Sequence, residues 1–185
     1  AFYLSFDNII PTGKRVMLSL DVSSSMTWEG CGGMPSVTPR VGSAAMAMVT
    51  MRTESDYLIT GFTTGLEVLD LSPKMRLDDV CDRLENLDFG GTDCSLPMLY
   101  ALENDLQFDA FVVYTDSETW AGEMHPVEAL KMYRKKTGIP AKLIVVGMEA
   151  NDFTIADPDD AGMLDVVGFD TAAPSVMSDF IREDL

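Results

Sequence analysis

The chain has 185 residues, which is long enough for one globular domain with a substantial buried core. Thirty acidic side chains against 13 basic ones give a net charge of −17, so the domain alone is expected to bind nucleic acid or anionic membranes poorly. No apolar run reaches the length of a membrane span, and the first residues lack the features of a signal peptide. The three cysteines form no paired set and no CxxC motif, which favours a reducing compartment.

The first half of the chain is predicted to alternate strands with helices. A short apolar, β-prone run predicts a strand over Val16–Leu20. Thr38 is a suitable N-cap, with Pro39 as the first residue of a helix that is apolar almost all round and should therefore be buried. Strands are expected at Tyr57–Phe62 and Leu66–Leu69, close enough together to form a hairpin. The next helix has an apolar stripe of Leu77, Val80, Cys81, Leu84 and Leu87.

The second half continues the alternation. It is predicted to contain helices at Ser95–Asn104 and Pro126–Thr137, strands at Phe111–Tyr114, Leu143–Val146 and Asp165–Phe169, and a last helix with Val176, Met177, Phe180 and Ile181 on one face. Strands that alternate with helices predict an α/β fold with a mostly parallel sheet. In such sheets, ligands bind outside the carboxyl ends of the strands.

Oxygen-bearing side chains cluster at these predicted strand ends. Asp21, Ser23 and Ser25 follow the first strand, Thr92 lies in a glycine-rich turn before a helix, and Asp116 follows "FVVYT". If the chain after Asp21 is extended, its side chains at every second position point to the same side. Carboxylate and hydroxyl oxygens suit Mg²⁺, Mn²⁺ or Ca²⁺ better than zinc.

The charge of this ligand set favours recognition over catalysis. Two of the five groups are anionic, so they would neutralise a divalent ion without oversupplying it with negative charge. Such an ion keeps a position open for an oxygen from another molecule. We find no nucleophile with an adjacent base near these residues, and we therefore predict a non-catalytic site.

The five residues resemble the metal-ion-dependent adhesion site of von Willebrand factor A (vWA) domains. Longer stretches resemble the C-terminal A domain of the Ro autoantigen (TROVE) family of RNA-binding proteins: "GGTDCSLPM", "YTDSETWAG", "HPVEALKMYRKKTGIPAKLIVVGM" and "FTIADPDDAGMLDVVGFDT". The resemblance covers nearly the whole chain and is weakest over Trp28–Ser36.

The resemblance implies a Rossmann-like α/β fold, with a central, mostly parallel six-stranded sheet and helices on both faces. It implies a vWA domain over residues 16–185, with residues 1–15 as the tail of a helical-repeat module that lies outside this sequence. The family binds Y RNA and misfolded noncoding RNA through that module, in a cytoplasmic ribonucleoprotein. The family's metal ligands carry over to Asp21, Ser23, Ser25, Thr92 and Asp116, some of them through water.

These expectations together describe a divalent-metal-dependent module that recognises a protein, with Mg²⁺ as the preferred ion and no role for a membrane. The partner would supply an acidic oxygen to the metal, and Trp28 and Glu118 are the expected partner-binding rim. Glu29 and Asp93 would make this rim more acidic. An acidic rim repels an acidic partner, which argues against simple capture of a carboxylate.

Two alternative functions stay open. The domain could brace the RNA-binding module, with a vestigial metal site. It could also be a metal-dependent phosphohydrolase with Asp21 as nucleophile, but such enzymes need a second acid where this chain has Ser23. The single histidine, His125, precedes a predicted helix and is better explained by local capping or packing than as a catalytic base.

Overall fold

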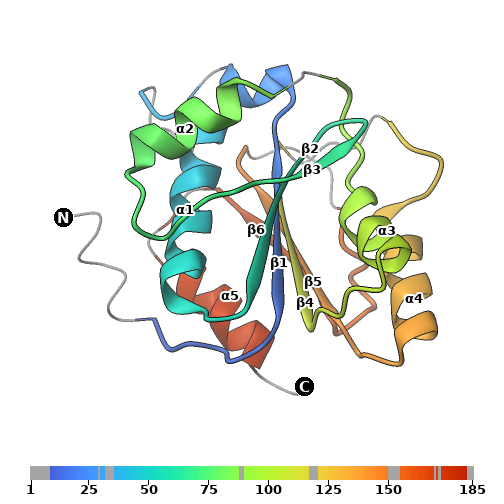
Figure 1. Cartoon of the computed structure of the whole chain (residues 1–185). Coiled ribbons are helices and arrows are strands. Elements are labelled where there is room, and N and C mark those ends of the chain that lie inside the picture. Colours follow the sequence, from blue (N-terminus) through green and yellow to red (C-terminus); the bar gives the residue numbers. More distant parts are fainter. Residues whose placement is uncertain are drawn as a thin grey trace.

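A computed structural model describes residues 9–28, 30–31, 36–87, 90–116, 121–149, 155–168, 170 and 172–182. The described chain forms one six-stranded sheet with helices packed on both sides (Figure 1). The strands are β1 (Val16–Asp21), β2 (Tyr57–Phe62), β3 (Leu66–Val68), β4 (Ala110–Thr115), β5 (Lys142–Gly147) and β6 (Met163–Val167). The helices are η3 (Ser24–Thr27, a 3₁₀ helix), α1 (Pro39–Thr53), α2 (Leu77–Glu85), α3 (Leu96–Glu103), α4 (Pro126–Thr137) and α5 (Ala173–Arg182).

The sheet has the order β3-β2-β1-β4-β5-β6. Every neighbouring pair is parallel except β2 and β3, which form the expected antiparallel hairpin. β1 lies between β2 and β4, and its Leu18 faces Ile59 on one side and Val112 on the other. The predicted α/β fold with a mostly parallel sheet is therefore confirmed.

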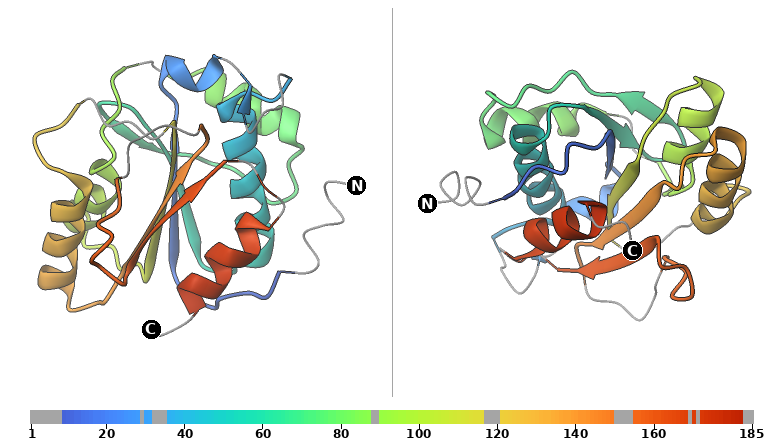
Figure 2. Two further views of the ribbon diagram at one scale, coloured as in Figure 1. Left: turned by 180° about the vertical axis from the view of Figure 1, so that it is seen from behind. Right: turned by 90° about the horizontal axis from the view of Figure 1, so that it is seen from below.

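The helices form two layers, one on each face of the sheet (Figure 1; Figure 2, right). Helices α1, α2 and α5 cover one face, while α3 and α4 cover the other. Side chains along β1 alternate between the two cores: Leu18 and Leu20 belong to the first, and Met17 to the second. The same alternation places the Val22 side chain on the face covered by α2 and the Asp21 side chain on the opposite face of the sheet.

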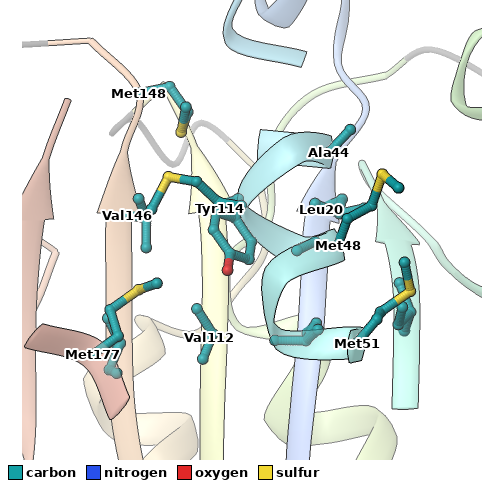
Figure 3. Close-up of a cluster of buried hydrophobic side chains, with 14 of the residues drawn as sticks. Leu20, Ala44, Met48, Met51, Val112, Tyr114, Val146, Met148 and Met177 are labelled. Carbon is teal, nitrogen blue, oxygen red and sulfur yellow. The ribbon is translucent and has the colours of Figure 1, made fainter. Parts of the chain in front are cut away.

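The first helix is buried, as its sequence predicts. Thr38 caps α1 by accepting a hydrogen bond from the Val41 N–H at 3.3 Å, and Pro39 is its first residue. Met46, Met48 and Met51 are each at most 2 % exposed. Figure 3 shows methionines from α1, α5 and the end of β5 packed around Tyr114. Unbranched methionine side chains fill the irregular space between helix and sheet, so these residues form the core.

Three details differ from the sequence prediction. Strand β6 begins at Met163, two residues before the predicted start, and Phe169 lies outside the described residues. Leu87 lies beyond the end of α2, so it is not part of a helical stripe. Val176 is 49 % exposed on α5, whereas Met177 and Ile181 are buried. These errors concern element ends and the rotation of a helix, which depend on neighbours distant in sequence.

The segment before β1 runs along the end of the sheet opposite the metal-ligand candidates (Figure 1). The Glu54 carboxylate accepts hydrogen bonds from the N–H groups of Thr12 (2.7 Å) and Gly13 (3.1 Å). Arg15 pairs with Asp109 at 2.7 Å. This segment is therefore fastened to the domain. Within the part of the chain that is described, no helix is long and apolar enough to cross a membrane.

Candidate metal centre and related proteins

Two adjacent parallel strands end in the two carboxylates of the candidate site. Asp21 is the last residue of β1, and Asp116 directly follows the last residue of β4. Because β1 and β4 are parallel neighbours, both carboxylates lie at the carboxyl edge of the sheet. Asp21 is 1 % exposed, whereas Asp116 is half-buried. The predicted position of both residues at the ligand-binding edge agrees with the structure.

The two serines reach Asp21 by a different route from the one predicted. The chain after Ser23 is not extended, because residues Ser24–Thr27 form η3. The Ser23 N–H donates to Asp21 Oδ1 at 2.8 Å, and the hydroxyls of Ser23 and Ser25 lie 3.0 Å apart. The 3₁₀ turn, rather than a two-residue alternation, therefore brings these hydroxyls together.

Two threonines complete the surroundings of Asp21. The Thr92 hydroxyl donates to Asp21 Oδ2 at 3.3 Å, and Thr92 is 3 % exposed. The Thr115 hydroxyl donates to the same oxygen at 2.9 Å and lies 3.4 Å from Asp116 Oδ1. The sequence reasoning missed Thr115, although its position at the end of β4 beside Asp116 was a usable signal. The Thr115 hydroxyl therefore lies within hydrogen-bond distance of both carboxylates.

Asp93 connects the loop of Thr92 to the loop after β4. Its Oδ1 accepts hydrogen bonds from the N–H (3.0 Å) and the hydroxyl (2.6 Å) of Ser95. A Cβ added to Gly122 would lie 2.3 Å from Asp93 Oδ2, and the Ala121 N–H donates to the Thr92 carbonyl at 3.0 Å. Asp93 is 6 % exposed, so the prediction that it forms an acidic rim is wrong. Its carboxylate is turned inward, where it is needed as a hydrogen-bond acceptor.

Arg40 supports the serine loop from behind. It lies in the first turn of α1, is 3 % exposed, and its Nη2 donates to the carbonyls of Val22 (3.2 Å) and Ser23 (3.4 Å). Burial lowers the pKa of Arg40, while the charges of Glu85 and Asp21 oppose that change. Arg40 therefore orients the backbone that carries the hydroxyls. An arginine in the first turn of a helix that was expected to be buried was the sequence signal for this role.

Asp21 is the electrostatic centre of the site. The pKa of Asp21 is raised from 3.8 to about 6: burial raises it most, hydrogen bonds from Ser23 and Thr115 lower it, and the nearby charge of Asp116 also raises it. Among the described residues, no basic side chain forms an ion pair with Asp21. The carboxylate is thus desolvated and next to a second acid, an arrangement that a cation would stabilise.

The donor set suits a hard divalent cation. Among the residues that the structure describes, no three Asp, Glu, His or Cys side chains gather into a metal-ligating cluster. An ion held by the described residues would therefore use hydroxyl oxygens as well as the two carboxylates. That mixture suits Mg²⁺, Mn²⁺ or Ca²⁺, which take oxygen ligands, better than zinc, which more often takes nitrogen and sulfur ligands.

The expected partner-binding rim is only partly described. Trp28 follows η3 and is 63 % exposed, so its ring is available to another molecule. Glu118 and Glu29 lie outside the described residues. His125 caps α4, where its Nδ1 accepts a hydrogen bond from the Val127 N–H at 3.3 Å. The prediction of a capping role for this histidine is therefore confirmed.

Comparison with known proteins agrees with this architecture. Residues 15–181 match the Ro60 vWA domain family. RNA-binding protein RO60 of Deinococcus radiodurans is 48 % identical over the whole chain, and that of Caenorhabditis elegans is 46 % identical over 97 % of it. The crystal structure of the Deinococcus radiodurans RO (RSR) protein superposes with a TM-score of 0.90, at 47 % identity over 99 % of this chain.

The chain spans about a third of the length of these relatives: 35 % and 28 % of the two RO60 proteins, and 37 % of the crystallised chain. A membrane protein of Bacteroides fragilis related to aerotolerance has the same fold, with a TM-score of 0.63 over 92 % of this chain at 17 % identity. The match over nearly the whole sequence, the high identity to RO60 proteins and the shared six-stranded architecture show that this chain belongs to the Ro60 vWA domain family.

Proposed function

We propose that this domain is a non-catalytic recognition module that binds a divalent cation, Mg²⁺ in preference to Mn²⁺ or Ca²⁺, and through it a protein partner. The proposed ligands are Asp21, Ser23, Ser25, Thr92 and Asp116, some of them through water. A bound ion would accept a carboxylate oxygen from the partner. The observation that carries the proposal is the convergence of the hydroxyls of Ser23, Ser25 and Thr92 and the carboxylate of Asp116 near the buried carboxylate of Asp21, which forms no ion pair among the described residues.

The whole protein is proposed to be a cytoplasmic Ro-type ribonucleoprotein. Relatives that are about three times as long carry the name RNA-binding protein. With a net charge of −17, this domain is poorly suited to contact RNA phosphates itself. We therefore assign Y RNA and misfolded noncoding RNA to a separate module, and the protein partner to the metal centre.

Catalysis has less support than recognition. A phosphohydrolase with Asp21 as nucleophile needs a second acid two residues later, where Ser23 stands. The relatives are named as RNA-binding proteins and not as enzymes. Turnover of a generic phosphoester by the native domain, lost in Asp21→Ala, would favour the enzyme instead.

Calorimetric titration of the native domain with Mg²⁺ tests the metal site. We expect Asp21→Ala and the milder Ser25→Ala to weaken Mg²⁺ binding by at least about tenfold, and Asp56→Ala, at an exposed aspartate near the opposite edge, to leave it unchanged. Equal binding by all four proteins would refute the site. If Mg²⁺ binds but Asp116→Ala changes no partner interaction of the full-length protein, the domain is a structural brace instead.

A further inference from the structure

A recess of about 340 Å³ opens next to the candidate metal centre. It lies at the carboxyl end of β2, between the β2–β3 turn and the end of α2. Gly61 forms part of its wall, and a Cβ there would lie 2.9 Å from Leu87 Cδ1. The absence of a side chain at Gly61 therefore helps to keep the recess open. The residues that line it are Val22, Gly61, Phe62, Thr63, Thr64, Gly65, Leu66, Glu67 and Leu87.

The recess shares its backbone with the metal-ligand loops. Val22, one of its lining residues, stands between Asp21 and Ser23, and its N–H donates to the Phe62 carbonyl at 3.1 Å. The Thr63 carbonyl accepts a hydrogen bond from the Asp93 N–H at 3.0 Å, directly after Thr92. These two hydrogen bonds place the rim of the recess beside the backbone that carries Asp21, Ser23 and Thr92.

A second contact ties the rim of the recess to the turn that carries Thr92. A Cβ added to Gly90 would lie 3.1 Å from the Thr64 hydroxyl and 3.2 Å from the Thr63 hydroxyl. The β2–β3 turn thus packs against the glycine-rich turn with almost no space between them. The rim of the recess therefore lies directly against the turn that carries Thr92.

The lining of the recess combines apolar side chains, hydroxyls and one carboxylate. The partly exposed side chains of Leu66 and Leu87 supply apolar surface, Val22 and Phe62 are buried beneath it, and the hydroxyls of Thr63 and Thr64 are hydrogen-bond acceptors. Among the described lining residues, Glu67 alone carries a charge, and it is exposed on the edge strand β3. Lysine and arginine side chains lay their methylene stems along apolar surface and keep the charged end near water and acids.

We propose that the recess binds a lysine or arginine side chain of the same protein partner whose carboxylate reaches the metal centre. The proposal rests on the proposed function for its account of the carboxylate. A partner with acids alone would be repelled by a domain of net charge −17. If the partner carries a basic side chain next to an acidic one, the basic group can pair with Glu67 while the carboxylate binds the metal. A basic group bound in the recess would therefore offset the repulsion between this acidic domain and the acidic group of its partner.

The first experiment probes the recess without metal. Methyl signals of Val22, Leu66 and Leu87 are followed by NMR in EDTA while n-butylammonium or neutral n-butanol is added. We expect the cation to shift these signals and to bind about threefold or more tightly than the alcohol, which is the range of an exposed ion pair. Glu67→Gln should abolish that preference, and Glu128→Gln, on α4 away from the recess, should keep it. Equal binding of the two probes, or no shifts at these methyls, overturns the proposal.

The second experiment joins the two sites and separates the two proposals. A series of ω-amino acids of increasing chain length carries an ammonium group and a carboxylate on one molecule. With Mg²⁺ present, we expect one length to bind more tightly than both n-butylammonium and acetate, and this gain to vanish in EDTA. If the carboxylate adds no affinity with Mg²⁺ present, although n-butylammonium still binds the recess more tightly than n-butanol, the proposed metal function is refuted and the proposed binding of a cation in the recess is supported. If acetate binds with Mg²⁺ but no chain length improves on it, the link between the recess and the metal centre is refuted.

Discussion

Asp21 shows how a single residue acquires its properties from its neighbours. On its own it is an aspartate at a strand end, a common position for a helix cap or a turn. Burial beside Asp116 raises the pKa of its carboxyl to about 6, so its charge state changes close to neutral pH. The sequence identified the residue and the structure defined its electrostatics, because burial and the distance to Asp116 depend on two strands far apart in the chain.

The raised pKa of Asp21 predicts how the stability of the metal-free domain depends on pH. The folded pKa lies above the unfolded value, so this residue contributes stability that is fully present below pH 4 and lost as the pH rises through about 6. We expect the native domain to lose roughly 2 kcal/mol between pH 4 and 7 relative to Asp21→Asn, which stays neutral. Urea unfolding of both proteins in EDTA measures this difference. Parallel pH curves for the two proteins would contradict the prediction.

Gly122 provides a second test at the residue scale. Its φ of +92° is costly for alanine, and a Cβ there would collide with the Asp93 carboxylate. Gly138 has a φ of +75° but open space around it, so it serves as a matched control. We expect both alanine variants to lose about 1 kcal/mol of stability from backbone strain, and only Gly122→Ala to lose more and to weaken Mg²⁺ binding. Equal effects of the two substitutions on unfolding and calorimetry would show that the Asp93 contact is unimportant.

At the scale of elements, local signals predicted the helices well where the chain itself supplied start and stop residues. Thr38 and Pro39 start α1, and α4 runs from Pro126 to Thr137, where Gly138 adopts the left-handed conformation that ends many helices. The rotation of α5 was less predictable, because Val176 has the same hydrophobicity whether it faces the core or solvent. The packing of α5 on the sheet decides which residues of its apolar stripe are covered.

The segment before β1 is an element whose structure depends on one side chain. Glu54 directly follows α1 and accepts hydrogen bonds from the N–H groups of Thr12 and Gly13. We expect Glu54→Ala to speed hydrogen exchange at these two amides by about tenfold or more, because each loses a charge-assisted hydrogen bond. Glu103→Ala, at the exposed end of α3, should leave both rates unchanged. Unchanged exchange in Glu54→Ala would mean that Arg15 and Asp109 hold the segment without its help.

At the scale of the whole molecule, charge is the dominant feature. The excess of acidic residues gives a net charge of −17, and four of the basic residues lie on α4, where two of them pair with acids. Lys131 pairs with Asp157, and Arg134 with Asp160. Little positive charge is left to contact a polyanion, so the field of the domain repels RNA at long range.

This charge predicts that the isolated domain does not bind RNA measurably. We expect fluorescence anisotropy of a labelled single-stranded RNA to stay flat with domain concentrations up to about 10 µM, even at low salt, where phosphate contacts are strongest. The same titration with Mg²⁺ present checks that metal binding creates no RNA site. Saturable binding that weakens steeply with added salt would show that RNA contacts this domain directly.

The sequence by itself determined the alternation of strands and helices, the burial of α1, and the oxygen-rich residues at the strand ends. These features follow from periodicity and residue type within short windows, so they can be read without a structure. The convergence of Asp21 and Asp116 was also predictable, since parallel strands share a carboxyl edge. The resemblance to the Ro family followed from the same motifs, and the family match confirms it.

Only the tertiary structure decided how the site is held together. Thr115 bonds to Asp21 across 94 residues of chain, and the inward turn of Asp93 depends on a glycine in another loop. The 3₁₀ turn after Ser23 and the recess beside Val22 likewise depend on Arg40, on the β2–β3 turn and on the end of α2. Local sequence cannot specify these contacts, because each arises where segments from distant parts of the chain meet and exclude water.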